Sequence, residues 1–311
     1  MILSPGAKLN LGLYITGKRP DGYHNLLTCF FQIPFSDSLE IAKAAEQDSM
    51  EAPYEKWTHK LAPSNPLQPA AVQLPHLPIR FSCSGLEIKG AVEDNLCIKA
   101  YELLKKDFPQ LPAIQMHLHK KVPMGAGLGG GSADASATLL YLNELGNLGL
   151  MESQLVDYAQ RLGSDCPFFI KQGPQIGRGK GEILDPVKLS LKGYHLVLVC
   201  PGIHVPTPVA FKLVTPQPGP SMEQFMALLA SGASNWKDTL MNQFEASVFA
   251  QFPKIAAIKK ALYDKGAIYA SMSGSGSAVF GLFNKDAFEA ISIENALADE
   301  LGDLDIHSWL L

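Results

Sequence analysis

Long apolar runs and a surplus of basic residues are both missing from this sequence of 311 residues. No apolar stretch approaches the roughly 18 residues that a membrane-spanning helix requires, so we expect no membrane partner. The net charge is -4, whereas a protein that binds nucleic acid presents a basic stripe, so we expect no nucleic-acid partner. The first residues lack a basic region followed by a long apolar core, so we expect no signal peptide.

Cysteine pairs with the short spacing of a redox or zinc motif are also absent. The five cysteines are scattered along the chain, at Cys29, Cys83, Cys97, Cys166 and Cys200. An odd number of widely spaced cysteines is typical of reduced, mostly buried thiols, with a catalytic cysteine as the less favoured alternative. We therefore expect a cytoplasmic protein. For the oligomeric state, we expect a monomer or weak homodimer.

Strands and helices mix without a strict βαβ rhythm, which favours an α+β fold in a chain long enough for two packed units. Alternating apolar residues over 8–18 predict a strand with one buried face, and Lys8 and Asn10 share its other face. A turn leads into a returning strand over residues 23–35. Six prolines within residues 43–80 predict a surface insertion with room for a short strand or turn, with a functional lid as the less favoured alternative.

Other segments follow helical or strand periodicity. Helices are predicted over residues 93–108, 135–145, 153–162, 253–265 and 286–301. Strands are predicted over residues 114–119, 194–200, 267–272 and 278–283. His117 and His119 share one face of the first of these strands and could bind a metal, but we favour a solvent-facing strand because no third ligand lies nearby.

The strongest functional signal is a glycine-rich segment, in which five of the seven residues 125–131 are glycine. Glycine lets the backbone adopt positive φ angles and approach a ligand closely. A helix is predicted directly afterwards, so N–H groups and the positive end of the helix dipole converge, as in a phosphate site. A flexible linker is the alternative, but linkers are not flanked by an alternating strand and an apolar helix.

Two common phosphate loops do not describe this segment. Gly125, Gly127 and Gly130 satisfy G-x-G-x-x-G, but a dinucleotide fold needs a buried parallel strand before the loop and an acid about 20 residues after it. The P-loop pattern G-x-x-x-x-G-K-[ST] is absent.

Two further segments carry candidate residues. Asp165 follows a predicted helix in apolar surroundings, where it could serve a function or cap backbone N–H groups. Residues 271–278 form a small-residue loop between two apolar strands, which could be a plain hairpin or a second set of backbone donors for phosphate.

In their order, these motifs resemble those of the galactokinase–homoserine kinase–mevalonate kinase–phosphomevalonate kinase (GHMP) superfamily. Within it, the chain resembles the family of 4-diphosphocytidyl-2-C-methyl-D-erythritol kinases, at residues 5–11, 21–24, 123–134, 163–169, 179–182, 201–211 and 273–276. The resemblance implies a two-domain GHMP kinase fold, with the site between the domains. The N-terminal, ATP-binding domain (1–155) would be like domain 2 of ribosomal protein S5, and the C-terminal domain (156–311) ferredoxin-like.

The resemblance also implies an activity, which is transfer of the γ-phosphoryl group of ATP to the 2-hydroxyl of 4-diphosphocytidyl-2-C-methyl-D-erythritol. This reaction belongs to the non-mevalonate route to isoprenoid precursors. Lys8 and Asp165 are the implied catalytic pair, and Mg²⁺ is the implied cofactor, with unknown ligands. The implied ATP-binding residues are Pro123, Met124, Gly125, Ala126, Gly127, Leu128, Gly129, Gly130, Gly131, Ser132 and Ala133.

The substrate-binding residues that the resemblance implies fall into two groups. Asn10 and Thr207 would position the methylerythritol part. Tyr23 and Phe211 would sandwich the cytosine while His24 hydrogen-bonds its edge. Stacking on rigid aromatic rings is an expected way to hold a flat base.

The sequence departs from the family in places. Residues 43–80 are longer and richer in proline than the family's stretch there. Gln243 stands where the family often has an aspartate, so no role of that acid is carried over. Asp134, at a position that varies between acid and amide, is left unassigned.

Two rival functions remain at this point. A sister kinase of the superfamily, acting on homoserine or a mevalonate-type substrate, would have no base to stack on Tyr23 and Phe211. A non-enzymatic nucleotide-binding or RNA-associated module is disfavoured by the net charge of -4 and by the presence of both Lys8 and Asp165.

Overall fold

A computed structural model describes residues 1–44, 72–74, 77–214, 216–285, 290–302 and 304–311. Its contacts group the chain into two compact units, each assembled from separate stretches. Unit 1 comprises residues 1–7, 35–122 and 130–171, and unit 2 comprises residues 8–34, 123–129 and 172–311. The units interleave in sequence, and the division into domains at residue 155 stays a prediction.

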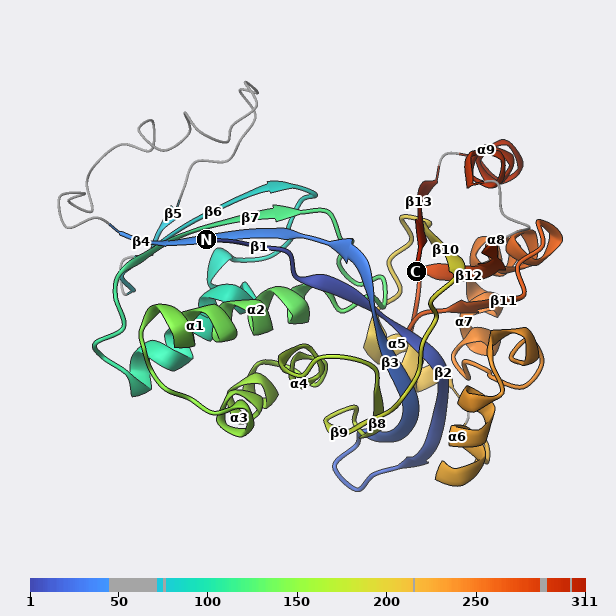
Figure 1. Ribbon diagram of the computed structural model, residues 1–311, viewed down its shortest axis with the longest axis horizontal. Helices are drawn as coiled ribbons and strands as arrows, with labels where there is room; N and C mark the ends of the chain where they lie inside the picture. Colours follow the sequence, from blue (N-terminus) through green and yellow to red (C-terminus); the bar gives the residue numbers. More distant parts are fainter. Residues whose placement is uncertain (45–71, 75–76, 215, 286–289, 303) are drawn as a thin grey trace. The chain divides into compact units, whose positions relative to one another are not determined.

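Unit 1 is a five-stranded sheet with helices on one face (Figure 1). The strands, in spatial order, are β1 (Ile2–Leu3), β4 (Ser38–Lys43), β7 (Ile114–Lys120), β6 (Ile79–Gly85) and β5 (Val72–Gln73). The helices are α1 (Leu96–Asp107), α2 (Gly130–Leu145), α3 (Glu152–Leu162) and α4 (Cys166–Ile170). Buried and half-buried residues alternate along β7, as expected of a strand with one covered face.

The other face of this sheet carries the two histidines of β7. Ser82 Oγ lies 2.8 Å from Nδ1 of His117, and Ser84 Oγ lies 3.0 Å from Nε2 of the same ring. Ser84 Oγ also lies 2.8 Å from Nδ1 of His119. Within the described ranges, no three His, Cys, Asp or Glu side chains gather into a possible metal site. Serine hydroxyls thus contact both ring nitrogens of His117 and Nδ1 of His119.

Unit 2 contains nearly all of the predicted hairpin, β2 (Gly6–Lys18) and β3 (His24–Ser36). The sheet is extended by β8 (Gln175–Gly179) and β9 (Ile183–Pro186), which the sequence analysis did not predict. The expectation of a single buried face on β2 is wrong, because every residue from 6 to 15 is buried. Lys8 and Asn10 are only 3% and 2% exposed, so their shared face lies inside the protein.

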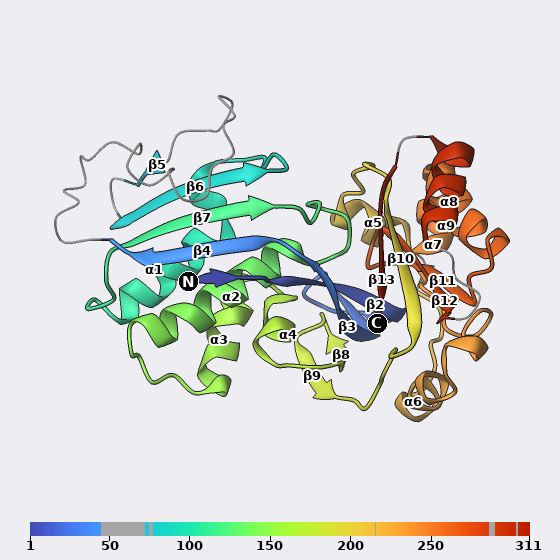
Figure 2. The same cartoon turned by 45° about the horizontal axis from the view of Figure 1, so that its top comes forward.

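A second sheet in unit 2 has the order β11-β12-β10-β13, with all neighbours antiparallel (Figure 2). Its strands are β10 (Tyr194–Cys200), β11 (Tyr269–Met272), β12 (Val279–Asn284) and β13 (Asp305–Leu310). Helices follow β10 and β12, which gives the β-α-β-β-α-β order of a ferredoxin-like fold and confirms that expectation. Residues of α8 (Pro253–Asp264) and α9 (Ala290–Leu301) join the core against this sheet.

Three helices between β10 and β11 were not predicted, namely α5 (Thr207–Leu213), α6 (Met222–Ala230) and α7 (Glu245–Gln251). One of them has a clear start signal. Ser221 and Gln224 form a capping box, in which Gln224 N donates to Ser221 Oγ at 3.2 Å and Ser221 N donates to Gln224 Oε1 at 2.8 Å. Five prolines before that box, at 206, 208, 216, 218 and 220, obscure the helical pattern of the preceding segment.

The proline-rich insertion expected over residues 43–80 lies largely outside the described residues, as does the start of the helix expected over residues 286–301. In the described end of the insertion, β5 pairs antiparallel with β6. None of the helices in the described part of the chain is both long enough and apolar enough to cross a membrane.

Candidate active site

The glycine-rich loop, defined as residues 123–129, belongs to unit 2. Gly125, Gly127 and Gly129 have φ angles of 68°, 79° and 69°, a region that side-chain-bearing residues rarely adopt. The loop is attached to the start of β2, because the N–H of Lys8 donates to the carbonyl of Leu128 at 2.8 Å. Alternating left-handed glycines therefore carry the backbone past the buried Lys8.

A second loop, residues 273–277, packs directly on the glycine-rich loop, and we call it the serine–glycine loop. Ser273 Oγ donates to the carbonyl of Gly127 at 2.9 Å, and the N–H of Ala278 donates to the carbonyl of Ala126 at 3.1 Å. A Cβ on Gly127 would lie 2.0 Å from the carbonyl oxygen of Ser273. Of the two interpretations of this segment, a plain hairpin is insufficient, because the loop supports the glycine-rich loop.

The remaining residues of the predicted ATP-binding segment, Gly130 to Ala133, form the first turn of α2 in unit 1. The helix begins five residues earlier than the predicted start at residue 135. The first N–H groups of a helix have no partner within it and carry the positive end of its dipole. The early start thus places helical N–H donors within the glycine run itself.

Replacing Gly131 by alanine keeps the backbone N–H but adds a methyl group that would obstruct the approach of phosphate to this turn. We therefore expect the KM for ATP to rise at least about tenfold, as when one hydrogen bond to a charged group is weakened. Gly131 does not have a positive φ, and an added Cβ would meet only Leu96 Cδ1, at 3.9 Å. The variant should therefore melt at the wild-type temperature or above it, since alanine favours a helix. Steady-state kinetics and a thermal melt measure both effects.

Gly17→Ala is the matched control for that variant. Gly17 also lacks a positive φ and would have no atom within 4 Å of an added Cβ, but it lies far along β2 from the loop. Its KM for ATP should stay at the wild-type value. A folded Gly131→Ala enzyme with unchanged KM for ATP would contradict the assignment of this turn to phosphate binding.

Lys8 and Asn10 form a buried polar row between β2 and β3. Lys8 Nζ donates to Asn10 Oδ1 at 2.5 Å, and Asn10 Nδ2 donates to Thr28 Oγ1 at 3.0 Å. Thr28 Oγ1 in turn donates to the carbonyl of Gly12 at 2.5 Å, and Lys8 Nζ lies 5.3 Å from the centre of the Phe30 ring. Lys8 is therefore held inside the protein by polar contacts along β2 and β3. Sequence reasoning missed Thr28, which no local pattern distinguishes.

Asp165 occupies the N-cap position of α4 in unit 1 and is half-buried. Its side chain makes no capping hydrogen bond, so the capping interpretation is not supported. The helix is held in place by Ser136 of α2, whose Oγ donates to the carbonyl of Cys166 at 2.8 Å. The position of Asp165 at the start of α4 is thus fixed through α2 rather than through a capping bond of its own.

A buried ion cluster in unit 1 explains Asp134, which the sequence left unassigned. The Lys120 ammonium contacts the carboxylates of both Asp37 and Asp134, and Asp37 Oδ1 accepts the N–H groups of Lys121 and Val122 at 2.5 and 2.9 Å. Burial raises the pKa of Asp134 to about 7, against the lowering effect of Lys120. The cluster joins the end of β7 to the first turns of α2.

The aromatic residues predicted to bind a base lie in unit 2. His24 and Phe211 are stacked, with ring centroids 5.2 Å apart and an interplanar angle of 20°. Tyr23 is 59% exposed, and Lys180 Nζ lies 4.8 Å from the centroid of its ring. Sequence reasoning did not single out Lys180, although it lies in the segment 179–182 that resembles the family.

Thr207 opens α5 and lies one helical turn before Phe211, so the two share a helix face. Its Oγ1 lies 3.2 Å from Ser275 Oγ of the serine–glycine loop. An added Cβ on Gly274 of that loop would lie 3.4 Å from Asn10 Oδ1. The structure thus brings Asn10, Thr207 and the glycine-rich loop together around the serine–glycine loop, whereas Asp165 and the first turn of α2 belong to unit 1.

Comparison with known proteins decides the family. Residues 95–173 match the protein family described as "GHMP kinases N terminal domain", and residues 220–303 match the family described as "GHMP kinases C terminal". A protein of Bacteroides fragilis named 4-diphosphocytidyl-2-C-methyl-D-erythritol kinase is 47% identical over 287 residues, which cover 92% of this chain and 93% of the relative. The chain belongs to the 4-diphosphocytidyl-2-C-methyl-D-erythritol kinase family.

A second relative and two solved structures are also similar to this chain. The protein of that name from Bacteroides thetaiotaomicron is 45% identical over 289 residues, covering 92% of this chain and 93% of the relative. A crystal structure titled 4-(cytidine 5'-diphospho)-2C-methyl-D-erythritol kinase superposes with a TM-score of 0.76 at 29% identity, covering 99% of this chain and 98% of that one. The mevalonate kinase of Methanococcus jannaschii, with a TM-score of 0.68 at 12% identity and coverage of 100% and 98%, shares the fold.

Proposed function

We propose that this kinase transfers the γ-phosphoryl group of ATP to the 2-hydroxyl of 4-diphosphocytidyl-2-C-methyl-D-erythritol. The observation that carries the proposal is the identity of 47% over 92% of the chain to a relative of that name, together with a glycine-rich loop suited to phosphate. All five cysteines are free thiols, which supports the cytoplasm as its compartment.

The reaction needs a base, an anion site and compensation of charge more than it needs covalent chemistry. Asp165 accepts the proton of the 2-hydroxyl as its oxygen attacks the γ-phosphorus. The bond from that phosphorus to the β,γ-bridging oxygen breaks, and ADP leaves. Lys8 offsets the charge that develops during transfer. The half-buried carboxylate that makes no capping bond and the buried ammonium support these roles.

Residues 123–133 are assigned to ATP, with the backbone N–H groups of residues 124–133 as the phosphate donors. Positive φ angles at three glycines allow successive N–H groups to converge on an anion. The first turn of α2 adds helical donors and a partial positive charge.

Mg²⁺ is the implied cofactor of this type of transfer and, when bound, would offset the charge of the ATP phosphates. In such sites phosphates and water supply most ligands, with one or two carboxylates at most. The described residues contain no cluster of three or more potential ligand side chains, which fits an ion that enters with the nucleotide. We assign it no protein ligand.

The acceptor substrate is assigned to unit 2. Asn10 and Thr207 position the methylerythritol part, and their shared approach to the serine–glycine loop supports this role. Tyr23, His24 and Phe211 bind the cytosine. In the structure His24 already covers one face of Phe211, so base binding requires the His24 ring to move aside to the edge of the base.

A coupled assay of ADP release tests the function. With 4-diphosphocytidyl-2-C-methyl-D-erythritol as acceptor, we expect turnover, and with methylerythritol phosphate, which lacks the cytidylyl group, we expect little, because the remote binding energy is missing. Homoserine and mevalonate serve as further acceptors. Preferential turnover of either of these would replace the proposal with a sister kinase of the superfamily.

A further inference from the structure

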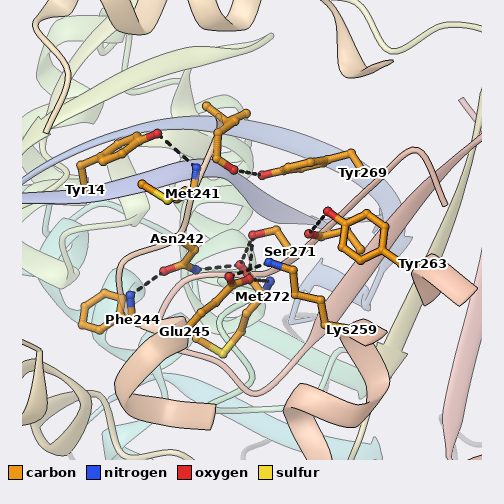
Figure 3. A network of polar contacts seen from close by, with 12 residues as sticks. Tyr14, Met241, Asn242, Phe244, Glu245, Lys259, Tyr263, Tyr269, Ser271 and Met272 are labelled. Atoms are coloured by element: carbon orange, nitrogen blue, oxygen red, sulfur yellow. Dashed lines mark hydrogen bonds and ion pairs between the residues drawn. The ribbon is translucent and has the colours of Figure 1, made fainter. Parts of the chain in front are cut away.

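A buried asparagine outside the proposed catalytic groups holds the serine–glycine loop. Asn242, 3% exposed, donates from Nδ2 to the carbonyls of Met272 and Gly274 at 2.7 and 2.8 Å. Its Oδ1 accepts the N–H of Phe244 at 3.0 Å. The side chain, shown in Figure 3, therefore spans the entrance and the middle of the loop while its own turn fixes its orientation.

Glu245, three residues later, holds the end of β11 just before the same loop. Its Oε1 accepts the N–H of Met272 at 2.9 Å and Ser271 Oγ at 3.2 Å. Its Oε2 pairs with Lys259 Nζ of α8 at 2.6 Å (Figure 3). Asn242 therefore donates to the carbonyl of Met272, and Glu245 accepts its N–H. Both backbone groups of Met272 are thus hydrogen-bonded by residues of a single turn.

The turn that carries these two side chains is also joined to β2. The N–H of Leu13 donates to the carbonyl of Met241, and the N–H of Gln243 donates to the carbonyl of Leu13, both at 2.8 Å. Gln243 Oε1 accepts the N–H of Ile15 at 2.7 Å. Residues 241–245 thus connect the strand that bears Lys8 and Asn10 to the loop that supports the glycine-rich loop.

We propose that Asn242 and Glu245 are positioning residues that fix the glycine-rich loop for ATP through the serine–glycine loop. This inference rests on the proposed function. The chain of contacts is continuous and lies within unit 2, from Asn242 through Gly274 and Ser273 to Gly127. A Cβ on Gly274 would lie 3.2 Å from Gly127 Cα, so the two loops have no space in which to shift independently.

Asn242→Asp is the primary test. It keeps the shape and the acceptor for the N–H of Phe244 but removes the two donors and places a carboxylate against two carbonyls. We expect the KM for ATP to rise at least about tenfold, as for loss of buried hydrogen bonds. The KM for the cytidylylated acceptor should rise less, since the loop reaches the acceptor residues only through Ser275 and Gly274. Hydrogen exchange should accelerate at the amides of residues 124–129 and remain unchanged in β6 and β7.

Tyr14→Phe is the matched control. The Tyr14 hydroxyl accepts the N–H of Met241 at 3.1 Å and donates to the carbonyl of Thr239 at 3.0 Å, so it stabilises the same segment without reaching the serine–glycine loop. We expect a lower melting temperature but an unchanged KM for ATP. Equal effects of Tyr14→Phe and Asn242→Asp on the KM for ATP, or an equal rise of both KM values in Asn242→Asp, would overturn the proposal.

A gentler variant applies if Asn242→Asp does not fold. Ser273→Ala removes only the bond from Ser273 Oγ to the carbonyl of Gly127, and it should raise the KM for ATP about threefold to tenfold. An unchanged KM in that variant contradicts the proposal. Calorimetric titration with ATP alone tests the positioning role separately from the proposed function. It measures the Kd for ATP, which reports the positioning of the glycine-rich loop even if the wild-type protein does not phosphorylate the cytidylylated acceptor.

Discussion

Asp165→Asn is expected to lower kcat by about 10²-fold or more, the usual loss when a general base is removed. The KM for ATP should remain close to the wild-type value, because the proposed phosphate donors are backbone N–H groups of other residues. Folding should be unaffected, since asparagine is as good an N-cap residue as aspartate and the native side chain makes no capping bond. Single-turnover kinetics with saturating ATP isolate the chemical step.

Asp157→Asn provides the comparison for that measurement. Asp157 is an exposed carboxylate on α3 of the same unit, so its removal changes the charge of unit 1 equally without touching α4. We expect its kcat to equal that of the wild type. A kcat for Asp165→Asn within about threefold of wild type would remove Asp165 from the mechanism.

Tyr23→Ala should raise the KM for the cytidylylated acceptor by about one to two orders of magnitude, matching the loss of base stacking. Tyr23 is the better probe of the base site than Phe211, because it is 59% exposed, whereas Phe211 packs edge-on against Phe244 at 4.8 Å and supports the core of unit 2. The KM for ATP should hardly change. Both constants come from the same ADP-release assay.

Tyr23→Phe keeps the ring and is therefore expected to bind the acceptor almost as well as the wild type. Lys180, which lies over the Tyr23 ring, can be tested in the same series with Lys180→Met. An increase in the KM for ATP in Tyr23→Ala, with the acceptor KM unchanged, is the result that the base-stacking assignment cannot accommodate.

Features set by neighbouring residues could be predicted from the sequence. The glycine-rich segment, the β2–β3 hairpin and the strands flanking residues 273–277 all depend on local periodicity or on the freedom of glycine. The β8–β9 hairpin was missed because Gly177 and Gly179 weaken its strand pattern. Gly177 is required there by a distant residue, since an added Cβ would lie 2.4 Å from Cε2 of Phe30.

The polar contacts that organise the site were harder to predict. Asn242 and Met272 are 30 residues apart in sequence, and nothing near Asn242 indicates its partner. The burial of Lys8 was also misjudged, because polar residues that alternate with apolar ones normally face solvent. Only the tertiary structure shows that β2 is covered on both faces.

The interleaved order of the two units has a consequence for synthesis on the ribosome. Residues 8–34 belong to unit 2, but the rest of that unit, apart from residues 123–129, begins only at residue 172. At a synthesis rate of about 5–20 residues per second, roughly 7–30 seconds pass between the synthesis of the β2–β3 hairpin and that of residue 172. Since β2 is buried on both faces in the native protein, its apolar side chains are exposed throughout this interval. We expect the growing chain to depend on chaperones that shield such strands until unit 2 can close.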